Sequence, residues 1–395
     1  MKKVDIIYSG WVSAPNGAST FVREMKDSIS IFSQYGIDLS VFSKDLFIAY
    51  PHRRKDKLRQ KMSLKSLLIS LVQYSILGTF VLLKRLYLYH SKYIVKRYLD
   101  MTKEMPDILY FQEVFTCYYF LKYRTDKNSK IYLTLHSEGD FWGMLYLQFP
   151  QFKKRIFASF RKKVENAILL QVHYIGFVAN TPRINFCQRY SFPHERTFFV
   201  YNGIPDIKRD VNYFLDKKKL DNKINLICVG TLCDRKNQYG ILKALKLLPG
   251  EVQKEYTLTL VGDGEDRKKL EQYSQQLLVE VRFIGSSNIV DEYLHSADCF
   301  ILFSKKEGLP IAIIEAMREG LPIISTSIAG IPELINDGEN GYLIELDELK
   351  LSNLLLRIAV ERPNLRHMGE ASRKLFNEKF TKEQMILSYS KIMKK

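Results

Sequence analysis

The chain has 395 residues, more than one hydrophobic core usually organises, so we expect two domains. Apolar residues make up 46% and charged residues 26% of the chain, proportions that exclude a fibrous, collagenous or disordered protein. The net charge is +17, and residues 1–200 hold 31 Lys and Arg against 15 Asp and Glu, which indicates an anionic partner for the N-terminal half.

The first predicted element is a β-strand at residues 4–9. Asp5 interrupts the apolar run that a secretory signal would need, so the N-terminus does not resemble a signal peptide. Further β-branched and aromatic runs, separated by helical stretches, predict strands at 37–43, 107–112, 130–137 and 176–180. Repeated strand and helix units predict a doubly wound, Rossmann-like α/β domain, which we place at residues 1–203.

Residues 53–99 form an insert that is longer than a strand crossover requires. A basic stretch comes first, a charge-free run follows at 66–83, and a run of interleaved basic and aromatic residues ends the insert. Lys and Arg on both flanks argue against a transmembrane helix. We expect an interfacial helix or helical pair on an anionic membrane surface, the alternative being a long helix packed on its own domain. No nucleic acid partner is expected, because no recognition-module signature accompanies the basic residues.

A second series of strands is predicted at 224–230, 257–262, 281–285, 299–304, 322–327 and 341–345. A polar, charged segment at 202–223 separates it from the first series. We therefore expect a second Rossmann-like domain at 204–380, facing the first, and a C-terminal helix at 381–395.

Two carboxylates and two cations stand at predicted strand ends of the C-terminal domain. Arg235 and Lys236 follow the strand at 224–230, and ligands bind at the carboxyl edge of open α/β sheets. Glu307 lies in a Gly-Pro turn, and Glu315, eight positions later, lies in the next helix. The turn and helix N-terminus favour a diphosphate, while Glu315 suits a vicinal diol such as ribose. Alone, each feature also fits a helix cap or a solvated loop.

The N-terminal domain offers a loop and a histidine at the same kind of edge. Asn16-Gly17 joins the first strand to a helix that Ser19 or Thr20 is expected to cap. This loop either closes over a sugar phosphate or is an ordinary turn. His136 follows the strand at 130–137, where it hydrogen-bonds a sugar or orients an acceptor hydroxyl, or is structural.

Four motifs in order resemble the family 4 retaining glycosyltransferases of GT-B fold. They are VGTLCDRKN (229–237), VGDGEDRKKLE (261–271), the run from Ser304 to Ile335, and GENGYL (338–343). The resemblance covers nearly all of residues 224–345 and is sparser before them. It implies retaining sugar transfer from a nucleotide diphosphate sugar, without a catalytic metal or other cofactor.

The resemblance also implies site residues. Glu307, Lys236, Arg235 and His136 are the expected catalytic residues; Gly17, Asn16, Gly230, Thr231, Ile284, Gly308, Leu309, Pro310 and Glu315 are the expected substrate-binding residues. Ile284 is expected to contact the base and Glu315 the ribose. The family commonly has Arg where Thr231 stands, so Arg235 is the candidate to replace that cation.

We therefore expect a glycosyltransferase that acts on a lipid-linked or surface-polysaccharide acceptor at the inner face of the cell membrane. Five cysteines without a CxxC pair indicate reduced thiols and a cytoplasmic location. The alternatives are a soluble transferase with a small-molecule or carbohydrate acceptor, and a non-catalytic nucleotide-binding subunit of the same fold.

Overall fold

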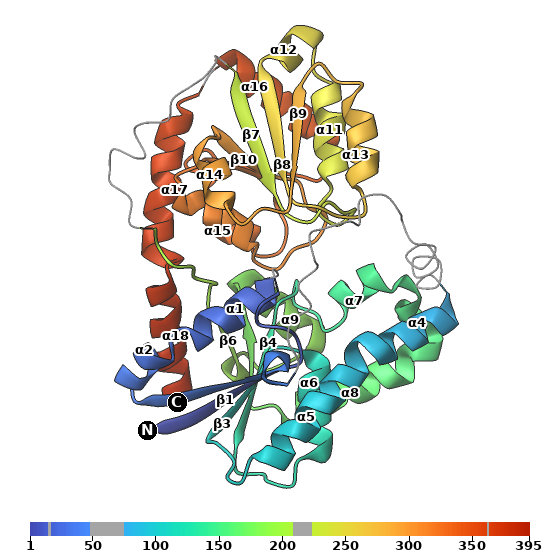
Figure 1. The fold of residues 1–395 in the computed structure, drawn as a ribbon, viewed down its shortest axis with the longest axis vertical. Coiled ribbons are helices and arrows are strands. Elements are labelled where there is room, and N and C mark those ends of the chain that lie inside the picture. Colours follow the sequence, from blue (N-terminus) through green and yellow to red (C-terminus); the bar gives the residue numbers. More distant parts are fainter. Residues whose placement is uncertain (15–16, 48–74, 208–222, 362) are drawn as a thin grey trace. The chain divides into compact units, whose positions relative to one another are not determined.

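The computed structural model describes residues 1–14, 17–47, 75–207, 223–361 and 363–395. The chain divides into two compact units: an N-terminal unit of Met1–Val200 with Ile386–Lys395, and a C-terminal unit of Tyr201–Met385. Each unit is built on its own six-stranded sheet with helices around it (Figure 1).

The N-terminal sheet has the strand order β2-β1-β3-β4-β5-β6, and all neighbouring strands are parallel. Its strands are β1 (Lys2–Tyr8), β2 (Ile37–Ser43), β3 (Ile108–Phe111), β4 (Lys130–Leu135), β5 (Tyr174–Phe177) and β6 (Thr197–Phe199). The strand predicted at 176–180 is displaced, because helix α9 already begins at Asn180. Strand β6 was not predicted, because three residues are too few to show a strand period.

The helices of the N-terminal unit cover both faces of this sheet (Figure 1). They are α1 (Gly17–Lys26), α2 (Ile29–Gln34), α4 (Ile76–Leu83), α5 (Tyr89–Met101), α6 (Val114–Tyr123), α7 (Gly143–Gln148), α8 (Ala158–Gln171) and α9 (Asn180–Tyr190), with short 3₁₀ turns at Lys44–Leu46, Pro150–Lys153, Arg155–Phe157 and His194–Arg196. The last helix, α18 (Lys382–Lys394), begins in the C-terminal unit, and its residues from Ile386 onward belong to the N-terminal unit.

Helix α1 begins two residues earlier than its predicted cap. Ser19 and Thr20 therefore lie inside the first turn, and the prediction that either is the N-cap is wrong. The reason is packing, because Ser19 is buried and its hydroxyl lies 3.0 Å from the hydroxyl of Tyr8 on β1. Asn16 lies outside the described residues.

The described half of the insert is one continuous helical stretch. Helix α4, a π-helical segment (Lys84–Leu88) and α5 follow one another without a break. One face packs into the core of the N-terminal unit, as the buried side chains of Leu83, Ile94, Val95 and Tyr98 show. On α4 the opposite face leaves Leu77 73% and Phe80 57% exposed. Residues 53–74 of the predicted insert lie outside the described residues.

The C-terminal sheet has the order β12-β11-β10-β7-β8-β9, again with parallel neighbours. Its strands are β7 (Ile224–Val229), β8 (Tyr256–Val261), β9 (Glu280–Gly285), β10 (Cys299–Leu302), β11 (Ile323–Thr326) and β12 (Gly341–Ile344). Its helices are α11 (Gln238–Lys246), α12 (Gly250–Lys254), α13 (Arg267–Ser274), α14 (Val290–His295), α15 (Ile311–Arg318), α16 (Glu348–Glu361) and α17 (Leu365–Lys379), with a 3₁₀ turn at Ile331–Glu333. Every residue of β10 and β11 is buried, as expected for strands covered on both faces.

Each sheet has a point at which the strand order reverses. In the N-terminal sheet the chain leaves β1 for β2 on one side and returns to β3 on the other; in the C-terminal sheet β8 and β10 flank β7 in the same way. Ligands of open α/β sheets bind at the carboxyl ends of the strands beside such a point. The loops after β1, β3, β7 and β10 are therefore expected to contain ligand-binding residues.

Candidate functional site

The loop after β7 brings two cations to the reversal point of the C-terminal sheet. Gly230 directly follows the strand with φ +148°, a backbone conformation that residues other than glycine rarely adopt. The chain then turns through residues 231–237 and enters α11 at Gln238. Arg235 and Lys236 lie in this turn, and the Lys236 residue is buried.

The loop after β10, the neighbour of β7, carries the carboxylate that these cations contact. Glu307 Oε1 lies 2.8 Å from Lys236 Nζ and 3.1 Å from Arg235 Nη1. Glu307 is 5% exposed, so burial alone would raise its pKa, but the two cations reverse that effect and lower the pKa of its carboxyl. The group is therefore ionised and held between two positive charges.

Hydrogen bonds to backbone carbonyls hold the loops after β7 and β10 together. Arg235 Nη1 donates to the carbonyl of Lys306 at 2.9 Å, and the amide of Lys305 donates to the carbonyl of Arg235 at 2.8 Å. Thr231 is exposed, and its carbonyl accepts a hydrogen bond from Gln238 Nε2 at 3.0 Å. Arg235, rather than position 231, thus supplies the second cation beside Glu307.

Helix α15 follows this loop and carries Glu315. Pro310 is its N-cap, and no side chain caps the helix, so the amides of its first turn receive no side-chain acceptor from the described residues. Burial raises the pKa of Glu315 to about 7, although Arg318 and Lys236 lower it. The backbone of Gly308–Pro310 lies between the two glutamates along the chain.

Ile284 lies on β9, the edge strand of the same sheet and two strands from β7. Its side chain is partly exposed. A close approach explains Gly262 at the end of β8, since a Cβ there would lie 2.0 Å from the carbonyl oxygen of Gly230. The ends of β7 and β8 are thereby packed tightly against each other.

In the N-terminal unit, His136 follows β4 and faces a residue that follows β3. Its Nε2 lies 3.0 Å from Gln112 Oε1. Burial lowers the pKa of His136 to about 4, so the imidazole is neutral at physiological pH. Gly17 is the first residue of α1 and is exposed. His136 and Gly17 thus lie at the carboxyl edge of the sheet of this unit.

Sequence reasoning missed two residues at these edges. Gln238 is 1% exposed and holds the β7 loop through Thr231 and Cys233. Glu113 lies two residues after the end of β3 and accepts three hydrogen bonds. The signal for Glu113 was present, because a carboxylate after the strand predicted at 107–112 meets the criterion by which Lys236 was chosen.

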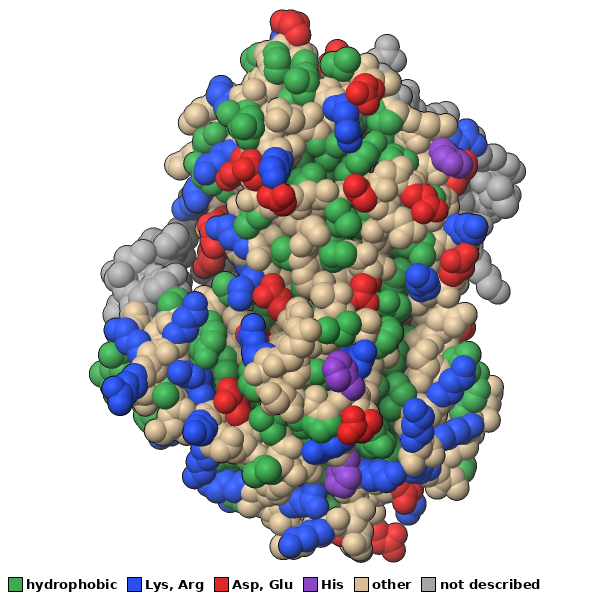
Figure 2. Space-filling model, turned by 180° about the vertical axis from the view of Figure 1, so that it is seen from behind, with side chains coloured by type: hydrophobic (Ala, Val, Ile, Leu, Met, Phe, Trp, Pro, Cys, Tyr) green, Lys and Arg blue, Asp and Glu red, His purple; other side chains and the backbone are tan. Residues whose placement is uncertain are grey.

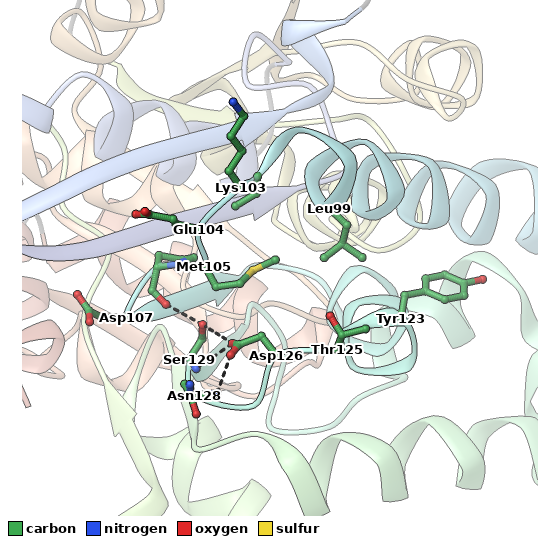
Figure 3. A pocket seen from close by; sticks show the side chains of 12 residues that line it. Leu99, Lys103, Glu104, Met105, Asp107, Tyr123, Thr125, Asp126, Asn128 and Ser129 are labelled. Carbon is green, nitrogen blue, oxygen red and sulfur yellow. Dashed lines mark hydrogen bonds between the residues drawn. The ribbon is translucent and has the colours of Figure 1, made fainter.

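A pocket of about 730 Å³ lies elsewhere in the N-terminal unit. Its wall is formed by residues that precede β3 and β4, among them Lys103, Asp107 and Asp126 (Figure 3). Asp126 accepts hydrogen bonds from Asn128 and Ser129 within the same turn. The pocket is therefore at the amino ends of these strands, whereas His136 lies at their carboxyl ends. No group of three or more metal-binding side chains occurs among the described residues.

The loops after β7 and β10 lie within a stretch of the chain that matches a known protein family. Residues 212–375 match the model described as Glycosyl transferases group 1. The N-acetyl-alpha-D-glucosaminyl L-malate synthase of Bacillus anthracis is 30% identical over 207 residues, which cover 51% of this chain and 52% of that protein. The UDP-Gal:alpha-D-GlcNAc-diphosphoundecaprenol alpha-1,3-galactosyltransferase of Escherichia coli is 32% identical over 146 residues, covering 36% and 38%. The matched region spans about half the length of the first of these relatives.

Solved structures match over the whole chain. Sucrose-phosphate synthase from Thermosynechococcus elongatus superposes with a TM-score of 0.73 at 17% identity, covering 100% of this chain and 98% of that one. HepE of Anabaena, crystallised in complex with UDP, superposes with a TM-score of 0.68 at 16% identity and full coverage of both chains. The predicted fold class, two Rossmann-like α/β domains as in GT-B proteins, is confirmed.

Proposed function

We propose that this protein is a GT-B glycosyltransferase that moves one sugar from a nucleotide diphosphate sugar to an acceptor hydroxyl, with retention of anomeric configuration. The observation that carries the proposal is the convergence of Lys236 and Arg235 on Glu307 at the reversal point of the C-terminal sheet. The match to the Glycosyl transferases group 1 model and the UDP bound in HepE support a nucleotide-sugar donor.

The donor's diphosphate takes its place beside the two cations and the uncapped first turn of α15. Both features favour an anion, and the charge on the diphosphate grows as the glycosidic bond breaks. Glu307 then binds the sugar, Glu315 the ribose and the backbone at Ile284 the base. Arg235 and Lys236 supply the positive charge that the leaving group requires, which supports a reaction without a catalytic metal.

Retention follows when the acceptor attacks from the face that the leaving group occupies. The acceptor oxygen forms a bond to the anomeric carbon while the bond from that carbon to the diphosphate oxygen breaks. The electron pair leaves with the diphosphate, and the hydroxyl proton passes to a departing phosphate oxygen. This path needs no enzyme nucleophile.

The acceptor is proposed to be lipid-linked or part of a surface polysaccharide, reached at the inner face of the membrane. Exposed Leu77 and Phe80 on α4, and the Lys and Arg side chains over the N-terminal unit in the lower half of Figure 2, support contact with an anionic bilayer. The Escherichia coli relative is named for a diphosphoundecaprenol-linked acceptor. Among the described residues, no helix is sufficiently long and apolar to span a bilayer.

Two other functions each have an observation in their favour. Helix α5 packs into its own core through Ile94, Val95 and Tyr98, as expected of a soluble transferase with a carbohydrate or small-molecule acceptor. Thr231 leaves its position without a cation, as expected of a non-catalytic nucleotide-binding subunit. Glu307 and its two cations favour the enzyme over the second of these.

The test is incubation of the purified protein with a panel of nucleotide sugars and membrane extract, followed by mass spectrometry of the products. We expect one donor to lose its sugar, and Glu307→Ala to reduce turnover about 100-fold or more while the fold is retained. Glu378→Ala, an exposed glutamate on α17, is the matched control. Nucleotide binding without turnover of any donor would indicate the non-catalytic subunit instead.

A further inference from the structure

Glu113 is a carboxylate at the reversal point of the N-terminal sheet to which the proposed reaction assigns no role. It follows β3, the neighbour of β1, and precedes α6. Its Oε2 accepts hydrogen bonds from the Ser9 amide at 2.7 Å, the Ser9 hydroxyl at 2.6 Å and the Thr116 hydroxyl at 2.8 Å. One oxygen thereby anchors the start of the loop that leads from β1 to α1.

The other carboxylate oxygen of Glu113, Oε1, accepts no hydrogen bond from the described residues. All three hydrogen bonds end on Oε2, and none of the described residues donates to Oε1 or forms an ion pair with the carboxylate. The side chain keeps some solvent exposure, although burial raises its pKa. A partly buried carboxylate without a cation is costly, and such groups gather at functional sites.

Asp45 is a second carboxylate that anchors this loop, and it can be compared with Glu113. Its Oδ2 accepts from the amide of Val12 and its Oδ1 accepts from the hydroxyl of Ser13, both at 2.6 Å. Both oxygens are used, and although burial opposes the effect, these hydrogen bonds lower the pKa of Asp45. Anchoring the loop therefore does not explain why Glu113 leaves an oxygen available.

The neighbours of Glu113 connect it to His136, a predicted site residue at this edge of the sheet. Gln112, the residue before it, lies against His136 at the end of β4, and β1, β3 and β4 are adjacent strands. Ser9, Glu113 and His136 thus follow three adjacent strands at the edge where ligands of such sheets bind. A carboxylate oxygen in this position accepts hydrogen bonds and repels anions.

We propose that Glu113 is an acceptor-binding residue, whose Oε1 receives a hydrogen bond from a hydroxyl of the acceptor. The group it orients is consequently a sugar or polyol hydroxyl rather than a carboxylate or phosphate. This inference rests on the proposed function, in which the C-terminal unit holds the donor, and it adds that the N-terminal unit binds the acceptor.

The experiment measures how a donor sugar divides between water and an added hydroxyl compound. The probes are glycerol and octyl β-D-glucopyranoside, and the readouts are donor hydrolysis, glycoside formation and the KM values for donor and probe. A hydrogen bond to a charged group is worth about 1.5–3 kcal/mol, so we expect Glu113→Gln to lower the ratio of transfer to hydrolysis about 10-fold or more. The KM for the probe rises, and the KM for the donor changes less than about twofold. Glu113→Asp, which keeps the charge, loses less than Glu113→Gln.

Two controls separate acceptor binding from loop anchoring. Ser9→Ala removes a hydrogen bond to Oε2 and a contact with the Ser91 hydroxyl but leaves Oε1 as it is. Asp45→Asn loosens the same loop, so neither variant is expected to change the ratio. An equal fall of the ratio in Ser9→Ala, or a parallel loss of transfer and hydrolysis in Glu113→Gln, would overturn the inference. Wild-type protein that hydrolyses a donor but glycosylates neither probe would do the same. If wild-type protein consumes no donor at all, the proposed function fails, and the role of Glu113 fails with it.

Discussion

Glu315 is expected to make the stability of the folded protein depend on pH. Its pKa is raised to about 7 from an ordinary value of 4.5, chiefly by burial. Between these two values the folded chain binds more protons than the unfolded chain, so the stability that this group contributes at low pH is lost as the pH rises toward 7. Glu315→Gln cannot ionise and escapes this loss.

We therefore expect Glu315→Gln to match the wild type in Tm near about pH 5 and to exceed it near about pH 8. Thermal unfolding across this range measures the difference. Glu378→Gln, on the exposed face of α17, is the control and should follow the wild type throughout. A Glu315→Gln curve parallel to the wild type at every pH would contradict the raised pKa.

Individual site residues were predictable where they directly follow a predicted strand. Arg235, Lys236 and Glu307 all follow buried apolar runs, so the sheet rule located their loops without coordinates. The sharing of one Glu307 oxygen by both cations was not predictable, because it depends on how two loops 71 residues apart are hydrogen-bonded. Glu113 follows the strand predicted at 107–112, so the same rule would have located it, although no phosphate-binding turn or basic pair stands beside it in the sequence.

Among the elements, strands were predicted best where the apolar run is unbroken. Strand β2 matches its predicted residues, and β10 begins at the predicted Cys299. Strand β6 is three residues long and pairs only with β5, so its existence depends on a tertiary partner. The start of α1 was misplaced for a similar reason, since Ser19 satisfies its hydroxyl with Tyr8 instead of capping the helix.

Helix α4 is the element on which the membrane proposal can be tested. Phe80 and Leu77 are exposed on it, while the other face of the helical stretch is buried at Leu83. We expect Leu77→Ser with Phe80→Ser to weaken sedimentation with anionic vesicles about 10-fold, because two apolar side chains no longer enter the interface. The binding is also expected to weaken with added salt.

Leu349→Ser with Val360→Ser is the matched control, since both residues are exposed on α16 in the C-terminal unit. This pair should leave vesicle binding unchanged. Equal binding by wild type and the α4 variant would count against a bilayer contact at this helix and favour the soluble transferase.

For the molecule as a whole, the length of the chain predicted the division into two units, and the two strand series predicted two parallel sheets. Charge was informative as well, since the excess of Lys and Arg lies within residues 1–200. The sugar, the acceptor and the linkage were beyond prediction, because they depend on a few hydroxyl contacts and not on patterning. The feature that links the fold to the proposed chemistry is a cationic diphosphate site in the C-terminal unit.

The most direct measurement is calorimetric titration of the wild type, Arg235→Ala and Lys236→Ala with UDP, ADP and GDP, and with the corresponding nucleosides. We expect each substitution to weaken the affinity for the preferred nucleoside diphosphate about 10- to 100-fold and to leave the affinity for the nucleoside unchanged, because the lost charge acts on the phosphates. Lys243→Ala, on the exposed side of α11, should bind as the wild type does. Diphosphate affinities that are unchanged in both Arg235→Ala and Lys236→Ala would contradict the account.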